Sequence, residues 1–305
     1  MKKIPIIIDT DPGIDDAVAI AVALNSEALD VRLITTIAGN VDVTKTTNNT
    51  LKLLNFFGSN INVAVGANTP LVREATEAKD IHGESGMDGY DFKEIDYSNL
   101  ITDTAVNAMY KEIMKTDGIV LVPIGPLTNI ALLLRIYPDV VSRIKGIVLM
   151  GGSTTRGNKG VMSEFNIHCD PEAAKMVFNS GIHITMCGLD VGFKALVFPE
   201  DSLKIKSLNE TGNMIYSLFQ HYRSFGLRNG LKMYDSCAIA YLLKPDMFTT
   251  VESFVDVETK GELTSGCTVV DLKNYMKKEP NCTVTIDIDQ EKFREWLIDS
   301  LSKCK

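Results

Sequence analysis

Acidic residues gather in one short stretch near the beginning of the chain. Four aspartates fall within eight residues, with Pro12 and Gly13 between the two pairs: Asp9, Asp11, Asp15 and Asp16. Carboxylates packed together repel one another and are costly to bury. A hard divalent cation with oxygen ligands, Ca²⁺ or Mg²⁺, offsets that cost. The simpler alternative is that one pair begins a helix and the other forms a turn, but for all four together we favour a cation site.

Two later aspartates also precede helical patterns. Asp235 comes directly before SCAIAYLL, where it can cap a helix or reach the cation site across the fold. Asp170 precedes Pro171, a natural first helical residue, and we interpret Asp170 as a cap only.

Candidate ligand-binding side chains occupy the polar loop 158–166. At their spacing, Asn158, Glu164 and Asn166 can hydrogen-bond a hydroxyl-rich ligand such as a sugar. Polar surface loops are common, so this pattern alone is weak.

The histidines divide into two groups. His82 lies in a glycine-rich segment that could close over a site, and His221 lies in a helical pattern beside aromatic residues that include Phe225. His168 and His183 lie in or next to apolar runs and are interpreted as structural. The sequence contains neither a G-x-S-x-G elbow nor a phosphate-binding G-x-x-x-x-G-K-[ST] loop, which argues against serine acyl chemistry and against an NTPase.

Short β-branched runs alternate with longer helical patterns over the first two thirds of the chain. Their continuous apolar character predicts an open, doubly wound α/β sheet, mostly parallel and covered on both faces. The predicted strands are 4–8, 31–37, 61–65, 118–124, 144–150 and 182–186, and the predicted helices are 14–25, 43–57, 102–116, 127–136 and 171–179.

The alternation ends near residue 200, where an appended helical and hairpin region follows. We predict helices over 201–229, 235–243 and 290–302, a hairpin of 254–258 with 267–271, and a strand over 282–289. Because no linker or repeat interrupts the chain, we expect a single domain over residues 1–305.

Composition limits the classes of partner. The 305 residues include 31 basic and 39 acidic side chains, a net charge of -8, which offers no overall basic face for nucleic acid. The six cysteines show no paired spacing, and the most apolar segment, 118–134, is broken by Pro and Gly. We therefore expect a cytoplasmic, soluble protein that binds neither nucleic acid nor a membrane.

The order of these motifs along the chain resembles that of a known protein family. Ligands of open α/β sheets bind beyond the carboxyl ends of the strands, where these polar segments fall. Together the segments resemble the nucleoside hydrolases, the inosine–uridine preferring type and its relatives. The resemblance covers essentially the whole chain and is carried by DTDPGIDDA (9–17), ITTIAGN (34–40), HGESGM (82–87), LVPIGPLTNIA (121–131), VLMGGS (148–153), EFNIHCDPEAA (164–174) and the region around Asp235.

The resemblance implies a tightly bound Ca²⁺ and a role for each matching residue. Asp11 would be the general base, and Asp9 would support the loop. The implied Ca²⁺ ligands are Asp11, Asp16, the backbone carbonyl of Ile124 and Asp235; the implied ribose-binding residues are Asp15, Asn40, Asn158, Glu164 and Asn166.

The sequence departs from the family pattern at the position of the leaving-group acid. Many members have His directly before the late metal-binding aspartate, whereas this chain has Tyr234. Tyr234 can donate through its hydroxyl, although a phenol with a pKa near 10 is a weaker acid than imidazole, or it can stack on the base. His82 or His221 can take over protonation, and both belong with Phe225 among the candidate base-pocket residues. The preference for purine or pyrimidine stays open.

Three functions follow from these observations. The leading hypothesis is a Ca²⁺-dependent ribonucleoside hydrolase that releases base and ribose in nucleoside salvage, with a homodimer or homotetramer implied by the resemblance. The second is a weak or inactive protein that binds a nucleoside or ribose. The third, less favoured, is a Mg²⁺-dependent phosphatase with Asp9 as nucleophile, which leaves the 158–170 loop unexplained.

Overall fold

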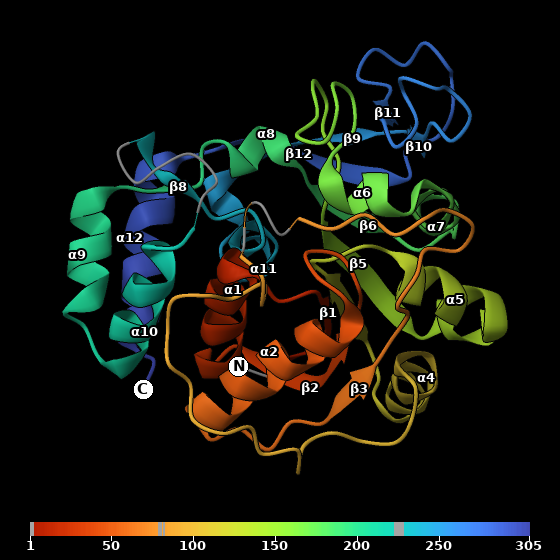
Figure 1. Cartoon of the computed structure of the whole chain (residues 1–305). Helices are drawn as coiled ribbons and strands as arrows, with labels where there is room; N and C mark the ends of the chain where they lie inside the picture. Colours follow the sequence, from red (N-terminus) through yellow and green to blue (C-terminus); the bar gives the residue numbers. More distant parts are fainter. Residues whose placement is uncertain (1–2, 79–80, 82, 223–228) are drawn as a thin grey trace.

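An eight-stranded sheet forms the centre of the computed structural model, which describes residues 3–78, 81, 83–222 and 229–305 (Figure 1). All neighbouring strands pair in parallel except β9, which is antiparallel to β12. In sheet order the strands are β3 (Val63–Val65), β2 (Leu29–Thr36), β1 (Ile4–Thr10), β4 (Ile119–Pro123), β5 (Ile144–Met150), β6 (Ile184–Cys187), β12 (Cys282–Ile288) and β9 (Phe248–Ser253). The predicted α/β class is confirmed.

Helices cover both faces of the sheet because each central strand is apolar on both sides. Along β1, Ile6 and Ile8 belong to one buried cluster and Ile7 to the other. The first cluster holds residues of α1 (Ile14–Asn25), α2 (Val43–Phe57), α10 (Glu210–Phe219), α11 (Ser236–Leu243) and α12 (Gln290–Ser302). The second holds residues of α4 (Ala105–Lys115), α5 (Thr128–Ile136) and α7 (Pro171–Phe178).

The sequence signals for helix ends coincide with the observed ends in several helices. Helix α2 begins after Asp42, whose carboxylate accepts the Lys45 N–H at 3.0 Å, and ends at Gly58 with φ of 63°. Helix α12 begins after Asp289, which caps it by accepting the Lys292 N–H. The predicted bounds of α1, α2, α12 and β5 are confirmed, and the other predicted strands and helices before residue 200 are present with shifted ends.

The region after residue 200 differs from the prediction in two ways. The long helix predicted over 201–229 is wrong: α9 (Pro199–Lys206) ends, and Asn209 caps α10 by accepting the Gly212 N–H at 2.8 Å. Helix α10 in turn ends at Phe219, and the short strand β8 (Leu231–Lys232) pairs with β7 (Leu196–Val197). Strand β9 was not predicted, because its polar, largely exposed sequence FTTVES lies at the sheet edge.

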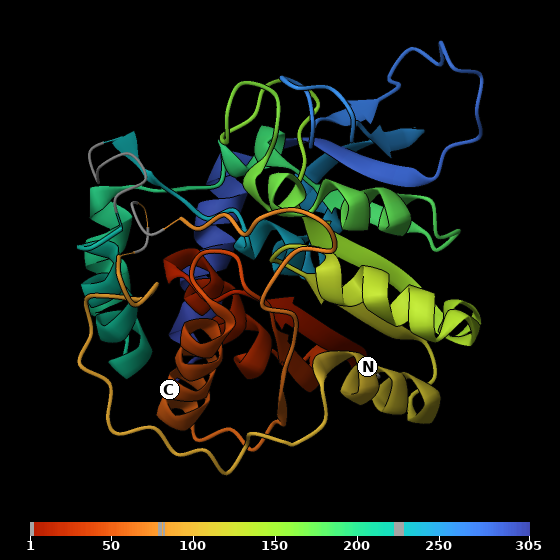
Figure 2. The same cartoon turned by 45° about the vertical axis from the view of Figure 1, so that its right-hand side comes forward.

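The predicted hairpin after residue 250 is confirmed. Strands β10 (Val255–Val257) and β11 (Thr268–Val270) pair antiparallel, and Figures 1 and 2 show them beyond one end of the central sheet. The remaining elements are η1 (Pro138–Ser142), α6 (Phe165–Cys169), α8 (Leu189–Gly192) and η3 (Pro245–Met247). None of the helices in the described ranges is both long and apolar enough to cross a membrane. All six cysteines are free thiols.

Strand order reverses at β1, which has β2 on one side and β4 on the other. The segments that follow β1, β2 and β4 therefore meet at one edge of the sheet, the position at which open α/β sheets bind ligands. Two backbone bonds join them, from Ile37 N–H to the Thr10 carbonyl (3.0 Å) and from Ile124 N–H to the Asp9 carbonyl (2.8 Å).

Candidate active site

The loop after β1 is held by its own aspartates. Asp16 accepts hydrogen bonds from the Thr10 hydroxyl (2.6 Å) and the Gly13 N–H (2.8 Å). Asp11 accepts the Asn40 N–H at 2.7 Å, and the Asn40 side-chain amide donates to the Asp11 carbonyl at 3.0 Å. The turn after β1 is thus joined to the loop after β2, and its carboxylates have fixed positions.

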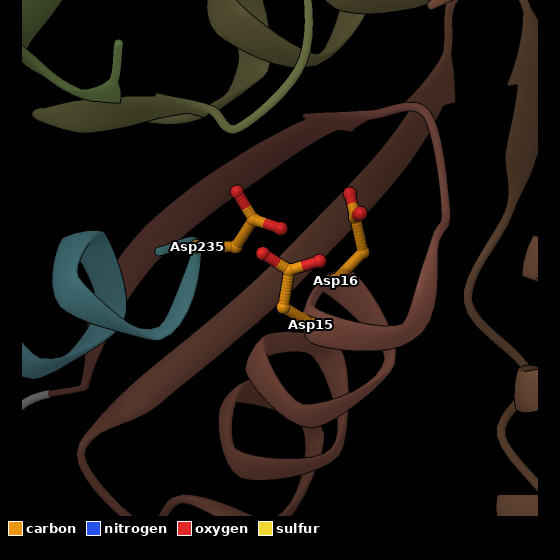
Figure 3. A group of neighbouring side chains, drawn as sticks. All are labelled: Asp15, Asp16 and Asp235. Atoms are coloured by element: carbon orange, nitrogen blue, oxygen red, sulfur yellow. The ribbon is translucent and has the colours of Figure 1, made fainter. Parts of the chain in front are cut away.

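Asp235 joins these aspartates from the far end of the chain. Carboxylate oxygens of Asp15, Asp16 and Asp235 lie within 4.8 Å of one another, and all three residues are buried. Figure 3 shows Asp15 and Asp16 on the first turn of α1 and Asp235 at the beginning of α11, with the carboxylates of Asp15 and Asp235 facing each other. Asp235 occupies the N-cap position of α11 without a side-chain capping bond, so its carboxylate is directed to the cluster instead.

Burial and mutual repulsion give these acids unusual protonation. Burial, reinforced by the charge of Asp16, raises the pKa of Asp15 to about 8. Burial also raises the pKa of Asp16, and it raises those of Asp11 and Asp235 well above the usual range, with the neighbouring carboxylates adding to the shift at Asp11 and Asp235. A cation would replace these protons, since it favours the charged form of each group.

The Asp11 carboxylate gives a second indication that this site fits a cation. Its Oδ1 is buried and accepts no hydrogen bond from the described residues. A buried, unpartnered carboxylate oxygen is costly. The all-oxygen donor set and this oxygen fit a hard cation such as Ca²⁺ or Mg²⁺. The observed three-carboxylate group includes Asp15, whereas the sequence implied Asp11, Asp16 and Asp235 with the Ile124 carbonyl.

A cavity of about 530 Å³ opens beside the acidic cluster. It collects side chains from the loops after β1, β2, β4 and β5 and from the segment between β8 and α11. Its described lining residues are Asp11, Asp15, Asn40, Glu77, Ala78, Ile81, Ile124, Met150, Asn158, Lys159, Glu164, Phe165, Asn166, Tyr222, Lys232, Tyr234 and Asp235.

The polar loop after β5 contributes the candidate sugar-binding residues. Glu164 is the N-cap of α6 and accepts the N–H groups of Asn166 (3.0 Å) and Ile167 (3.1 Å), while burial raises its pKa to about 7. The Asn166 side-chain amide donates to the Ile124 carbonyl at 3.0 Å. Asn158 also faces the cavity and accepts the Phe165 N–H at 2.9 Å. All three sequence-selected residues therefore line one wall.

Aromatic side chains and a lysine form another part of the lining. The Tyr234 ring packs edge-on against Phe193, with ring centroids 6.2 Å apart. Burial, together with the charge of Asp15, raises the pKa of Tyr234 and makes its hydroxyl a poor acid. The Tyr222 hydroxyl donates to the Lys232 carbonyl at 3.3 Å and also hydrogen-bonds Asp15.

Other sequence-selected residues have different positions. Asp9 is buried behind the cavity, where its Oδ1 accepts from Thr35 (2.5 Å) and Asn129 (2.8 Å). His221 differs from the expectation of a pocket residue: it is exposed, is not among the lining residues and has its Nδ1 3.2 Å from the Ser217 carbonyl. His82 and Phe225 lie outside the described residues.

Asp170, His168 and His183 are the three residues that the sequence analysis interpreted as structural. Asp170 caps α7 as predicted, accepting the Ala173 N–H at 3.0 Å. The same carboxylate also accepts from the Leu71 N–H and the Thr128 hydroxyl. His183 lies 3.0 Å from the Thr283 hydroxyl, while burial lowers the pKa of the partly buried His168.

Sequence reasoning missed Tyr222 and Lys232 as lining residues. The sequence predicted one helix over 201–229, which places Tyr222 in a helix and gives no reason to associate Lys232 with Tyr234. In an extended segment, residues two apart face the same side. The spacing of Lys232 and Tyr234 was therefore the signal in the sequence that could have placed both at the cavity.

Comparison with known proteins agrees with this architecture. The model of the family described as inosine-uridine preferring nucleoside hydrolase matches residues 6–295. The chain is 50% identical over 301 residues to the non-specific ribonucleoside hydrolase RihC of Escherichia coli (strain SMS-3-5 / SECEC), covering 98% of this chain and 99% of that protein. It is 51% identical over 296 residues to RihC of Salmonella typhi, covering 96% of each. A solved purine-preferring ribonucleoside hydrolase from Gardnerella vaginalis superimposes with a TM-score of 0.91 at 28% identity, covering 98% of both chains. This chain belongs to the inosine-uridine preferring nucleoside hydrolase family.

Proposed function

We propose that this protein is a Ca²⁺-dependent ribonucleoside hydrolase that cleaves the N-glycosidic bond and releases the free base and ribose. The observation that carries the proposal is the group of buried carboxylates from Asp15, Asp16 and Asp235 beside a nucleoside-sized cavity. Relatives that are about 50% identical to this chain are named non-specific ribonucleoside hydrolases. Those names support the same reaction and a broad range of bases.

The ligand set that we propose for Ca²⁺ is Asp11, Asp16, the Ile124 carbonyl and Asp235. Three of the four are buried carboxylates with raised pKa values, and the Asp11 Oδ1 has no described hydrogen-bond partner. Bound Ca²⁺ would hold the ribose 2′- and 3′-hydroxyls and lower the pKa of a water. The oxygen-only donor set favours a hard cation.

The residues around the cavity divide the remaining work. Asp11, as general base, takes a proton from the attacking water. Asp15 accepts hydrogen bonds from ribose hydroxyls, and Asn40 donates to them. The 5′ side of the sugar is bound by three residues of the 158–166 loop: Asn158, Glu164 and Asn166. Carboxylates near the sugar also stabilise the positive charge that develops on it as the bond to the base breaks.

The leaving base requires separate stabilisation. Tyr234 lines the cavity, and we place its ring against the base, where an aromatic face can stack. The raised pKa of its hydroxyl argues against proton donation by Tyr234 itself. His82 and Phe225 stay candidates from the sequence, and the exposed His221 has no structural support as a base contact.

Ribose release from a panel of inosine, guanosine, adenosine, uridine and cytidine tests the function. We expect turnover by the Ca²⁺-loaded protein, its loss after chelation and its return on adding Ca²⁺. The Asp11→Asn variant should lower kcat by about 10²- to 10⁴-fold, the usual contribution of a general base. Asp117→Asn, at a 94% exposed side chain, is the matched control and should leave kcat unchanged. A Ca²⁺-loaded protein that hydrolyses none of these nucleosides would refute the proposal.

The two alternative functions predict different outcomes. Tight nucleoside binding without release of the base would favour a binding protein. The phosphatase alternative needs Asp9 as an accessible nucleophile, but Asp9 is only 1% exposed and hydrogen-bonded to Thr35 and Asn129. This burial and these hydrogen bonds argue against a phosphatase.

Assembly and location complete the proposal. We propose a homodimer or homotetramer, which light scattering coupled to size exclusion can measure. The free state of all six cysteines is consistent with a reducing compartment, and we propose the cytoplasm.

A further inference from the structure

Lys232 is the feature of the cavity that the proposed mechanism leaves unused. It is half-buried, it lies on β8, and it lines the same cavity as Asp11 and Asp235. The described titratable lining residues are otherwise mostly acids, with Lys159 on the 158–166 loop as the other cation. A lysine directed into an acidic cavity therefore needs an explanation.

The Lys232 ammonium is surrounded by aromatic faces. Its Nζ lies 4.6 Å from the ring centroid of Phe193 and 5.9 Å from that of Tyr234. Aromatic rings attract a cation through their negative faces, so the ammonium is held near the rings rather than free in solvent. Of these two rings, that of Tyr234 also lines the cavity, where it offers a stacking surface to a flat nucleobase.

The backbone around Lys232 is fixed on both sides. Its carbonyl accepts the Tyr222 hydroxyl at 3.3 Å, and the next residue, Met233, donates its N–H to the Ala195 carbonyl at 2.9 Å. Tyr222 also hydrogen-bonds Asp15, which belongs to the carboxylate group. Tyr222 thus links Asp15 of the carboxylate group to the backbone of Lys232.

A cation at this place matches a demand of the reaction. The electron pair of the glycosidic bond passes to the departing base, which becomes negative unless a donor compensates for it. Lys232 is half-buried, so its ammonium is partly removed from water, and this burial lowers its pKa. Positive charge acts more strongly on a ligand in such a site than in bulk solvent.

Building on the hydrolase function proposed above, we propose that the Lys232 ammonium donates a hydrogen bond to an acceptor atom of the leaving nucleobase and stabilises its negative charge. The C1′–N bond breaks and its electrons go to the base. Water adds its oxygen to C1′ and gives one proton to Asp11, and the departed base takes one proton from solvent. Lys232 takes the place of the family's histidine by charge and hydrogen bonding.

The test compares substrates whose leaving groups need different amounts of help. Inosine and uridine release basic nitrogen anions, whereas p-nitrophenyl β-ribofuranoside releases p-nitrophenolate, which is stable without assistance. We expect Lys232→Met to lower kcat for inosine and uridine by about 10²- to 10³-fold, the usual effect of losing one such donor. The same variant should change kcat for the p-nitrophenyl riboside by less than about tenfold, and Lys232→Arg should restore most nucleoside activity because Arg keeps both the charge and the donors.

Lys159→Met is the matched control, because it removes the same charge from the same cavity. It should leave the ratio of nucleoside to p-nitrophenyl riboside kcat unchanged. Ca²⁺ affinity and melting temperature of each variant establish that the fold and the acidic site are intact. If Lys232→Met lowers both kcat values equally, or neither, the inference is overturned while the hydrolase function stands. If the wild type cleaves neither nucleoside, the hydrolase function itself fails.

Discussion

The Asp11 carboxylate lies so close to Gly39 and Gly125 that neither position has room for a side chain. A Cβ on Gly39 would collide with Asp11 Oδ2, and one on Gly125 would lie 2.5 Å from Asp11 Oδ1. Neither glycine has a positive φ, so close approach and not backbone conformation explains their presence. Asp11 is therefore positioned by the absence of neighbouring side chains as much as by the Asn40 N–H.

Gly125→Ala tests this close approach at the scale of one methyl group. The new Cβ should displace the Asp11 carboxylate and weaken Ca²⁺ binding by about 10- to 100-fold, the usual effect of disturbing the support of a metal ligand. Calorimetric titration with Ca²⁺ measures the change. Gly146→Ala is the control, because its Cβ would meet only the His183 carbonyl at an ordinary 3.4 Å. Equal affinities in the two variants would contradict the expectation.

The short helix α6 shows how an element positions the wall that we propose binds the sugar. Glu164 accepts the N–H groups of Asn166 and Ile167 at the beginning of the helix and that of Gly152 at the end of β5. Its carboxylate thus joins two elements while its residue lines the cavity. Asn166, on the first turn, is placed by the same bonds against the Ile124 carbonyl.

Glu164→Gln tests whether Glu164 positions the cavity wall without affecting cation binding. The amide has one acceptor oxygen, so it cannot receive all three N–H groups, and the wall residues should lose their alignment. We expect KM for inosine to rise about tenfold, the equivalent of one good hydrogen bond, with Ca²⁺ affinity unchanged. Steady-state kinetics and Ca²⁺ titration together check it. Glu200→Gln, at an exposed first-turn position of α9, is the control; a KM equal to that of the control would count against the role of Glu164.

At the scale of the whole molecule, the buried acids of the proposed cation site should couple stability to pH. In the metal-free protein, burial raises the pKa of Asp9 to about 7 and that of Asp15 to about 8, well above the ordinary value for an aspartate. A carboxyl group with a raised folded-state pKa favours the fold at low pH, and that contribution is lost as pH rises through the folded-state value. The metal-free fold should thus weaken between about pH 4 and pH 8.

Ca²⁺ should reverse this trend, because it stabilises the carboxylates in their charged form. Metal at about 100 times its Kd should raise Tm by roughly 5 °C at pH 8. The increase should be smaller at pH 6, where protons compete with the metal. Differential scanning calorimetry at both pH values, with and without Ca²⁺, measures the effect. Asp235→Asn should lose most of the Ca²⁺ response, and a Tm increase that is independent of pH would be inconsistent with proton displacement.

Much of the fold could be predicted because it follows from local patterns. Continuous apolar strands such as 4–8 predict a sheet covered on both faces, and caps such as Asp42 and Asp289 coincide with the beginnings of α2 and α12. The region 201–229 could not be predicted in the same way. Its helical pattern continues through Asn209, whereas α9 ends at Lys206, Asn209 caps α10, and the two helices pack against each other. The single-domain expectation stays a prediction.

The sequence by itself determined that a buried first strand leads into a stretch with four aspartates, because an apolar strand and the residues near its end are local properties of the chain. Only the tertiary structure decided which acids meet. Asp235 joins Asp15 and Asp16 because α11 packs beside α1, and Asp9 faces Thr35 and Asn129 instead of the cavity. It also decided that Lys232 lines the same cavity as the acids, since β8 pairs with β7 beside the segment that leads to Asp235. Contacts between distant segments depend on the packing of whole elements, which no local spacing in the sequence encodes.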